Sequence, residues 1–253
     1  MSPPPPPQPR QRLDQALVER GLVASRARAR DLILRGEVDV AGRTATKPAL
    51  LVTPTEDVRL VSGPADYVSR GVFKLQAALD HFRLDPAGRT ALDIGASTGG
   101  FTEVLLARGA QRVYAIENGH GQLHPRLSGD PRVISLERTD ARTLDSVLVP
   151  EPVDAIVADV SFVSLRKVLP SALALSDTAC WLVALVKPQF EGEPGSIPRD
   201  GIVKNPEAQA ASVQRIATWI AGEAGWRILG TIPSPIHGGD GNVEFLVGAA
   251  RNG

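Results

Sequence analysis

The feature that most constrains the fold is a regular alternation between short apolar segments and segments of helix length, which begins near residue 90. Seven of the apolar segments are predicted to be buried strands: TALDI, RVYAI, RVISL, VDAIVAD, CWLVALV, WRILGTI and VEFLVGA. Strands that alternate with helices form parallel or mostly parallel sheets with helices on both faces. We therefore expect an α/β, Rossmann-like sheet of seven strands. A turn at Gly241 and Asn242 predicts that the last strand enters as part of a hairpin.

The region before this alternation has a different character. Residues 1–11 contain six prolines and no core-forming residue, which is typical of a disordered, polyproline-like tail. Residues 12–61 predict a compact unit of two short helices, which end near Gly21 and Gly36, followed by small strands. Residues 62–70 are predicted to be a linker and residues 71–253 to form the larger domain.

Charge is distributed unevenly along the chain. The total is 28 Lys and Arg against 28 Asp and Glu, a formal net charge of zero. Residues 1–48 hold nine basic and five acidic residues, a surplus of four positive charges, so the remainder carries four excess negative charges. Arginine forks bind phosphate oxygens, which favours a nucleic-acid partner. The candidate RNA-binding residues are Arg12, Arg26, Arg28, Arg30, Arg35 and Arg70.

The basic segment carries a resemblance to a known module. RLDQALVERGLVASRARARDLILRGEVDVAG resembles the small αL RNA-binding module found in a ribosomal protein, in pseudouridine synthases and in tyrosyl-tRNA synthetases. This resemblance covers about residues 12–60 and implies a small α+β domain that recognises structured RNA through its shape and phosphates. An ordinary solvated helix face is the alternative explanation of the arginine run.

Acidic residues follow four successive predicted strands, with a glycine-rich loop after the first. Ligands of open α/β sheets bind beyond the carboxyl ends of the strands. Ser97 stands at the second glycine position of the dinucleotide fingerprint, which disfavours an NAD-linked oxidoreductase. The series favours S-adenosylmethionine, with Asp93 toward its cationic part, Glu117 toward the ribose and Asp140 toward the adenine. The candidate cofactor-binding residues are Asp93, Gly95, Ser97, Gly99, Gly100, Phe101, Glu117, Asp140, Ala141 and Asp159.

Three further charged residues stand in unusual places. Lys187 ends the apolar strand WLVALV, and lysine rarely ends an interior strand without a function. Glu244 interrupts the hydrophobic run of the predicted strand VEFLV. Lys74 lies in a helix that leads into the first strand of the sheet, where a solvated helix lysine is an equally good interpretation.

Motifs spread over residues 12–248 resemble those of a known family. The motifs are YVSRGVFKL, LDIGASTGGFTEVLL, GHGQL, DVSFVSL, LVKPQFE, DGIVKN and GNVEFL. Together they resemble the hemolysin-A-type (TlyA family) ribosomal RNA methyltransferases, in which an αL module is fused to an FtsJ-like 2′-O-methyltransferase domain. The resemblance implies a class I methyltransferase fold, S-adenosylmethionine as cofactor and ribosomal RNA or assembled ribosomal subunits as partner. It also implies a Lys-Asp-Lys-Glu tetrad at Lys74, Asp159, Lys187 and Glu244.

The implied reaction is an in-line displacement in which a ribose 2′-hydroxyl attacks the methyl group. Lys187 either accepts the hydroxyl proton as a neutral amine or, when charged, orients the hydroxyl and stabilises the developing negative charge. The sequence leaves both roles open. It also leaves open the modified nucleotide, the ribosomal subunit and the oligomeric state.

Two other functions fit the sequence less well than RNA methylation. A non-catalytic RNA-binding protein is disfavoured by the complete tetrad. A membrane-active hemolysin is disfavoured because no uncharged apolar stretch of about 18 residues occurs, and we expect no stable membrane association. The N-terminus has no apolar core of a secretory signal, and a single Cys180 agrees with a reducing compartment, so a cytoplasmic location is expected. No metal site is predicted, since metal-ligand spacing is lacking among His81, His120, His124 and His237.

Overall fold

The computed structural model describes residues 10–23, 25–34, 36–60, 67–192, 201–223, 225–238 and 241–251. These residues divide into two compact units. Among the described residues, the smaller unit comprises residues 10–60 with Gly238 and Gly241, and the larger unit comprises residues 67–237 and 242–251. Most of the expected tail and linker, together with Arg35, lies outside the described residues.

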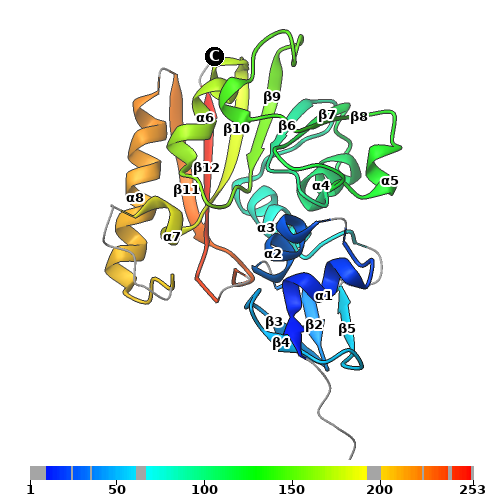
Figure 1. Ribbon diagram of the computed structural model, residues 1–253. Helices are drawn as coiled ribbons and strands as arrows, with labels where there is room; N and C mark the ends of the chain where they lie inside the picture. The colour runs from blue at the N-terminus through cyan, green and yellow to red at the C-terminus, as the bar shows by residue number, and fades with distance from the viewer. Residues whose placement is uncertain are drawn as a thin grey trace, which may run out of the picture. The chain divides into compact units, whose positions relative to one another are not determined.

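The smaller unit consists of two helices followed by short strands, as predicted, apart from a two-residue strand at its start (Figure 1). β2 pairs antiparallel with β3 and β5, while β1 pairs with β4. The apolar faces of the two helices are buried, with Leu13, Leu17 and Ile33 in the small core. Its elements are β1 (Gln11–Arg12), α1 (Leu13–Glu19), α2 (Arg26–Leu34), β2 (Val38–Val40), β3 (Arg43–Ala45), β4 (Leu51–Val52) and β5 (Val58–Leu60).

The larger unit is built on a seven-stranded sheet in the order β11-β12-β10-β9-β6-β7-β8. β10, β9, β6, β7 and β8 are parallel, whereas β12 runs antiparallel to both of its neighbours. The mostly parallel sheet and the closing hairpin are therefore confirmed. The strands are β6 (Thr90–Ile94), β7 (Arg112–Glu117), β8 (Val133–Glu137), β9 (Val153–Ala158), β10 (Ser176–Val186), β11 (Trp226–Pro233) and β12 (Phe245–Arg251).

Helices cover both faces of this sheet, as expected (Figure 1). Successive side chains of a strand point to opposite faces, so Leu92 and Ala91 belong to two different core clusters. One face packs against α3 (Gly71–Phe82), α4 (Gly100–Ala107) and α5 (Pro125–Ser128). The other face packs against η1 (Ala141–Thr143), α6 (Leu165–Ala174) and α8 (Pro206–Gly222), and α7 (Pro188–Glu191) follows β10.

The carboxyl ends of six strands, β6 to β11, lie on the same side of the sheet, and this carboxyl-end side is the edge at which the candidate site lies. The chain runs outward from β6 to β7 and β8, then returns to β9 and β10 on the other side of β6. The loops after β6 and β9 therefore diverge, and such switch points are where open α/β sheets bind ligands. The antiparallel β12 begins at this edge, because Phe245 pairs with Val186, the last residue of β10.

Helix α3 approaches β12 closely at a glycine. A Cβ atom built on Gly248 would lie 2.6 Å from Cδ2 of Phe82 and 2.8 Å from its Cγ. Contacts this short are absent from close-packed interiors. The missing side chain therefore lets the end of α3 lie against β12, and α3 carries Lys74 to the residue that precedes this strand.

We expect Gly248→Ala to lower the free energy of unfolding by about 1–3 kcal/mol, because the added methyl group must displace the ring of Phe82. Urea unfolding followed by circular dichroism measures this change. Gly222→Ala at the end of α8 is the matched control, since no atom lies within 4 Å of its Cβ position. A urea unfolding midpoint of Gly248→Ala that equals the wild-type value would contradict the close approach of α3 to β12.

Candidate active site

Two buried ion pairs lie at the edge of the sheet where the parallel strands end. Nζ of Lys187 is 2.7 Å from Oδ1 of Asp159, and Nζ of Lys74 donates to Oε2 of Glu244 at 2.6 Å. The exposed fractions are 7% for Lys74, 4% for Asp159, 5% for Lys187 and 3% for Glu244. Burying four charges costs more than burying apolar side chains of similar size. The arrangement therefore points to chemistry rather than to stability.

The strand register places three of these residues side by side. Asp159 follows β9 and Lys187 follows β10, and these two strands are adjacent and parallel. Glu244 was expected within the closing strand, but the structure places it one residue before β12. The ladder stops at the pair Val186–Phe245, because Pro188 begins α7 and has no N–H to continue β10.

The glycine loop between β6 and α4 packs against the protein itself. A Cβ atom on Gly95, where φ is +79°, would lie 2.5 Å from the backbone oxygen of Asp159. A Cβ atom on Gly99 would overlap Leu127, and one on Gly100 would overlap Ser69. These glycines therefore let neighbouring segments close onto the loop, and their contact with a cofactor stays a prediction. The side chain of Phe101 also belongs to the core, with 4% exposed.

Asp93 is a fully buried carboxyl group in β6, close to this edge. Its Oδ2 accepts a 2.6 Å hydrogen bond from Oγ1 of Thr102, and its Oδ1 has no hydrogen-bond partner among the described residues. Burial raises the pKa of Asp93 to about 7; the bond from Thr102 opposes the rise, and the charges of Asp159 and Glu117 add to it. A cationic ligand would favour the charged form of this group.

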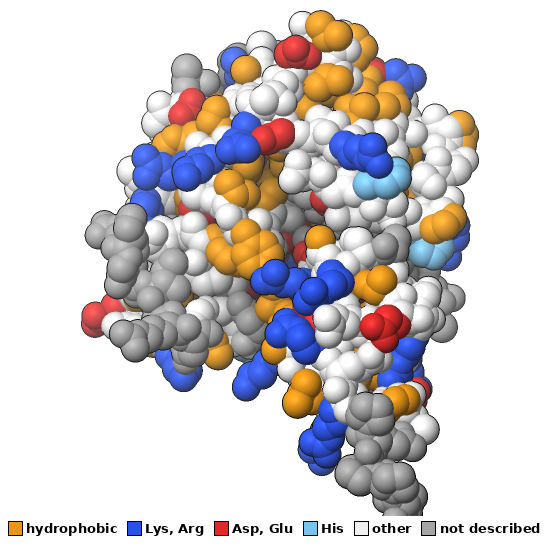
Figure 2. All heavy atoms as spheres, in the orientation of Figure 1, with side chains coloured by type: hydrophobic (Ala, Val, Ile, Leu, Met, Phe, Trp, Pro, Cys, Tyr) orange, Lys and Arg blue, Asp and Glu red, His pale blue; other side chains and the backbone are white. Residues whose placement is uncertain are grey.

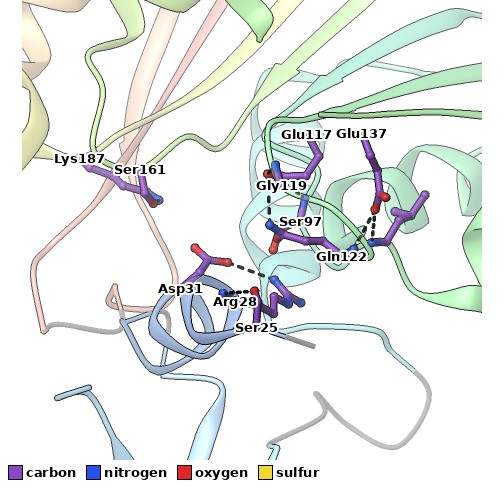
Figure 3. Close-up of polar contacts among 11 residues, drawn as sticks. Ser25, Arg28, Asp31, Ser97, Glu117, Gly119, Gln122, Glu137, Ser161 and Lys187 are labelled. Carbon is purple, nitrogen blue, oxygen red and sulfur yellow. Dashed lines mark hydrogen bonds and ion pairs between the residues drawn. The ribbon is translucent and has the colours of Figure 1, made fainter. Parts of the chain in front are cut away.

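Glu117 ends β7 and turns toward the glycine loop (Figure 3). Its Oε2 accepts a hydrogen bond from the backbone N–H of Ser97 at 3.0 Å, and its Oε1 accepts one from Gly119 at 2.7 Å. The amide of Gln122 also reaches Oε1, at 3.4 Å. The structure thus joins Glu117 and Ser97, two predicted cofactor residues that are 20 positions apart in the chain.

Glu137 holds the loop that follows Glu117, and the sequence interpretation missed it. Its oxygens accept backbone hydrogen bonds from Gln122 at 2.8 Å (Figure 3) and from Gly121 at 2.7 Å, and Nδ1 of His120 lies 2.9 Å away. Burial raises the pKa of Glu137, but the backbone N–H groups and His120 lower it more, so the net pKa lies below the usual range. Its position at the very end of the third strand was an available signal.

For the third strand of the sheet, β8, the sequence predicts Asp140 and Ala141 as the cofactor-binding residues instead. Asp140 caps η1, where it accepts the backbone N–H of Arg142 at 2.9 Å and also pairs with the guanidinium group. The side-chain bond to Arg142, helped by its backbone bond, lowers the pKa of Asp140 to about 2. Ala141 packs into the core with 9% exposed. In this structure the carboxylate of Asp140 thus has a protein partner.

Ser161 is a second residue that the sequence interpretation did not single out. Its Oγ accepts a hydrogen bond from Nζ of Lys187 at 2.9 Å (Figure 3). It lies two residues after Asp159, within the family motif DVSFVSL. Only the folded chain brings its hydroxyl to Lys187, 26 positions away.

The arginines of the smaller unit fall into different environments. Figure 2 shows Lys and Arg side chains gathered over α2, where Arg26 and Arg30 are exposed. Arg28 was expected to be exposed as well, which is wrong: it is 6% exposed and pairs with Asp31 at 3.1 Å. Position 28 lies one helical turn before the buried Leu32, on the inward face of α2.

Arg12 and Arg26 converge on one buried carboxylate. Arg12 is 2.9 Å and Arg26 3.0 Å from the oxygens of Asp14, which is fully buried. The bond from Arg12 lowers the pKa of Asp14 to about 2, against its burial, and the bond from Arg26 lowers it further. Arg70 lies directly before α3 in the larger unit and is partly buried.

Among the described residues, no group of three or more His, Cys, Asp or Glu side chains is placed to hold a metal ion. The described helices include none that is long and apolar enough to cross a membrane.

Comparison with known proteins agrees with this geometry. Residues 67–251 match the family described as FtsJ-like methyltransferase, and residues 11–58 match the S4 domain. The 16S/23S rRNA (cytidine-2′-O)-methyltransferase TlyA of Mycobacterium tuberculosis is 46% identical, over 94% of this chain and 89% of that protein. Hemolysin A of Brachyspira hyodysenteriae is 36% identical, over 93% of this chain and 98% of that protein.

A solved structure points the same way. A protein of Streptococcus thermophilus, named as a hemolysin, matches with a TM-score of 0.73 and 34% identity, over 97% of this chain and 90% of that one. The matches cover nearly the whole chain, and they include both the sheet that carries the two ion pairs and the small N-terminal unit. The chain therefore belongs to the FtsJ-like methyltransferase family, in the branch of the TlyA and hemolysin A proteins, with an S4 domain at its N-terminal end.

Proposed function

We propose that this chain transfers a methyl group from S-adenosylmethionine to the 2′-hydroxyl of a ribose in ribosomal RNA. The observation that carries the proposal is the pair of buried contacts, Lys187 with Asp159 and Lys74 with Glu244, at the ligand-binding edge of the sheet. Relatives from Mycobacterium tuberculosis and Campylobacter jejuni are named rRNA (cytidine-2′-O)-methyltransferases. A ribosomal cytidine is therefore the target to test first.

The residues beyond β6, β7 and β8 fit the cofactor. The buried Oδ1 of Asp93, which has no hydrogen-bond partner in the described part of the chain, suits a cationic amino-acid part, and Glu117 suits ribose hydroxyls. Asp140 and Ala141 suit the adenine, and the remaining contacts fall to the loop of Gly95, Ser97, Gly99, Gly100 and the backbone of Phe101. S-adenosylmethionine would supply the methyl group on a sulfonium whose sulfur keeps the electron pair of the broken bond.

The four tetrad residues have separate roles in the methyl transfer. As the neutral amine, Lys187 takes the proton of the 2′-hydroxyl while the hydroxyl oxygen forms its new bond to carbon; as the ammonium, it orients the hydroxyl and stabilises the developing negative charge. Asp159, 2.7 Å from Lys187, stabilises the ammonium that results. Lys74, held by Glu244, positions the ribose or its neighbouring phosphate. Alignment of the two substrates supplies the rest of the acceleration.

We expect Lys187→Ala to reduce methyl transfer at least about 100-fold, because the variant has no amine to accept the proton. Cofactor affinity should stay near the wild-type value, since the cofactor residues follow other strands. Transfer of labelled methyl to separated ribosomal subunits measures turnover, and calorimetry measures binding. Lys167→Ala, an exposed change on α6, is the matched control. Wild-type turnover of Lys187→Ala, checked by melting curves to be folded, would refute the tetrad assignment.

Cofactor affinity should depend on pH through Asp93. Its pKa of about 7 means that it is mostly protonated below neutrality, whereas a cationic ligand requires the carboxylate. Binding therefore releases a proton, and affinity should rise about tenfold from about pH 6 to about pH 8. Calorimetry over this range, in two buffers of different ionisation enthalpy, measures both effects. Asp93→Asn should abolish the pH dependence; a wild-type affinity that is flat across this range would argue against the assignment.

The smaller unit should bind RNA phosphates through the exposed arginines of α2. Replacement of Arg26 and Arg30 by Ala should weaken binding to ribosomal subunits and reduce the salt slope by about one for each phosphate that the helix no longer neutralises. Arg28→Ala should instead lower stability, since it removes a buried cation that pairs with Asp31. Binding titrations at several salt concentrations test this. An unchanged slope in the Arg26 and Arg30 variant would exclude phosphate binding by this helix.

A further inference from the structure

We propose that Ser161 is a positioning residue for methyl transfer, because its hydroxyl fixes the direction in which the amine of Lys187 faces the target hydroxyl. This inference rests on the proposed function, in which Lys187 is the reactive amine. Nζ of Lys187 is 2.9 Å from Oγ of Ser161 and 2.7 Å from Oδ1 of Asp159 (Figure 3). Both partners belong to the segment that follows β9, and Lys187 is 5% exposed.

The two contacts restrict the orientation of the amine. A lysine nitrogen is tetrahedral, and one of its four directions is the bond to its own carbon. Ser161 accepts a hydrogen bond along a second direction, whereas Asp159 contacts the nitrogen as an ion pair. In the neutral amine the bond to Ser161 uses one of two N–H groups, and in the ammonium one of three. In either state the direction toward the substrate depends on the bond to Ser161 in addition to the ion pair.

One contact alone would not fix that direction. The ammonium group is a point charge on a flexible four-carbon stem, and the amine can rotate about a single contact with Asp159. A rotated amine would aim a donated hydrogen, rather than its lone pair, at the ribose hydroxyl. Ser161 therefore matters for the alignment of the reacting atoms and not for binding of the cofactor, whose amino-acid part, ribose and adenine are assigned to residues at the ends of β6, β7 and β8.

The segment that carries Ser161 is tied to the segment that follows Lys187. Glu191 in α7 accepts the backbone N–H of Leu165 at 2.7 Å and the hydroxyl hydrogen of Ser164 at 2.5 Å. Glu191 is 6% exposed, so these bonds are shielded from water. Because α7 begins directly after Lys187, they hold Ser161 and Lys187 at a fixed separation.

A backbone reversal next to Ser161 adds to this arrangement. Phe162 has a φ of +66°, a left-handed conformation that a bulky side chain rarely adopts. Its ring lies 5.1 Å from the ring of Phe190, centroid to centroid. Residues held in such conformations cluster at functional sites. Here the reversal directly follows the residue whose hydroxyl meets Lys187.

The test compares three replacements of Ser161 in single-turnover methyl transfer to separated ribosomal subunits. Ser161→Ala should lower the rate about tenfold or more, the lower end of the effect of proton transfer by a positioned side chain, with KM for S-adenosylmethionine unchanged. Ser161→Thr, which keeps the hydroxyl, should restore most of the rate. Ser161→Val, which has the shape of threonine without the hydroxyl, should not. Ser171→Ala is the matched control, since that hydroxyl bonds only the backbone oxygen of Arg142.

Several outcomes would overturn the inference: a wild-type rate for Ser161→Ala, equal rates for the Thr and Val variants, or a loss confined to cofactor affinity. If melting curves show that Ser161→Ala does not fold, the Thr and Val pair decides. Lys187→Ala in the same assay separates the two proposals. Wild-type turnover of Lys187→Ala refutes the proposed function, whereas an inactive Lys187→Ala beside a fully active Ser161→Ala refutes only the role of Ser161.

Discussion

The parallel pairing of β6, β9 and β10 determines where the charged residues of the larger unit lie. Since parallel strands end at the same edge, Asp159 and Lys187 become neighbours although 28 positions separate them in the sequence. The antiparallel β12 adds Glu244 from the opposite chain direction, and α3 delivers Lys74 to it because Gly248 allows the helix to lie close. The same edge also holds Asp93, within β6, and Glu117, the last residue of β7.

This edge gathers charge at a cost in stability. Lys74, Asp159, Lys187 and Glu244 are almost fully buried, and one oxygen of Asp93 has no hydrogen-bond partner within the described ranges. Opposite charges in contact offset part of the desolvation penalty, but apolar residues of similar size would stabilise the fold more. Such a concentration of buried charge is what a site requires when it must orient a hydroxyl and hold a cationic cofactor.

Much of the fold and of the candidate site could be predicted from residue patterns. The seven apolar segments predicted the sheet, and residues after strand ends supplied most of the candidate site, because in open α/β sheets ligands lie beyond those ends. The pattern failed where a contact depends on the fold. Glu137 and Ser161 were missed, since their roles arise from backbone N–H groups and an amine brought to them by other segments. Arg28 was expected on the exposed face of α2, because the run of charged residues conceals the helical spacing that places position 28 on the buried face.

The sequence by itself determined the α/β sheet and the small basic helical unit, and it singled out the four proposed tetrad residues, since apolar periodicity and motif spacing are local properties of a chain. Only the tertiary structure decided which charges pair. It joined Lys187 to Asp159 and Ser161, and Lys74 to Glu244, and it left Oδ1 of Asp93 without a hydrogen-bond partner among the described residues. The physical reason is that pairing and desolvation depend on distances between segments far apart in the chain. Strand register and helix packing set those distances.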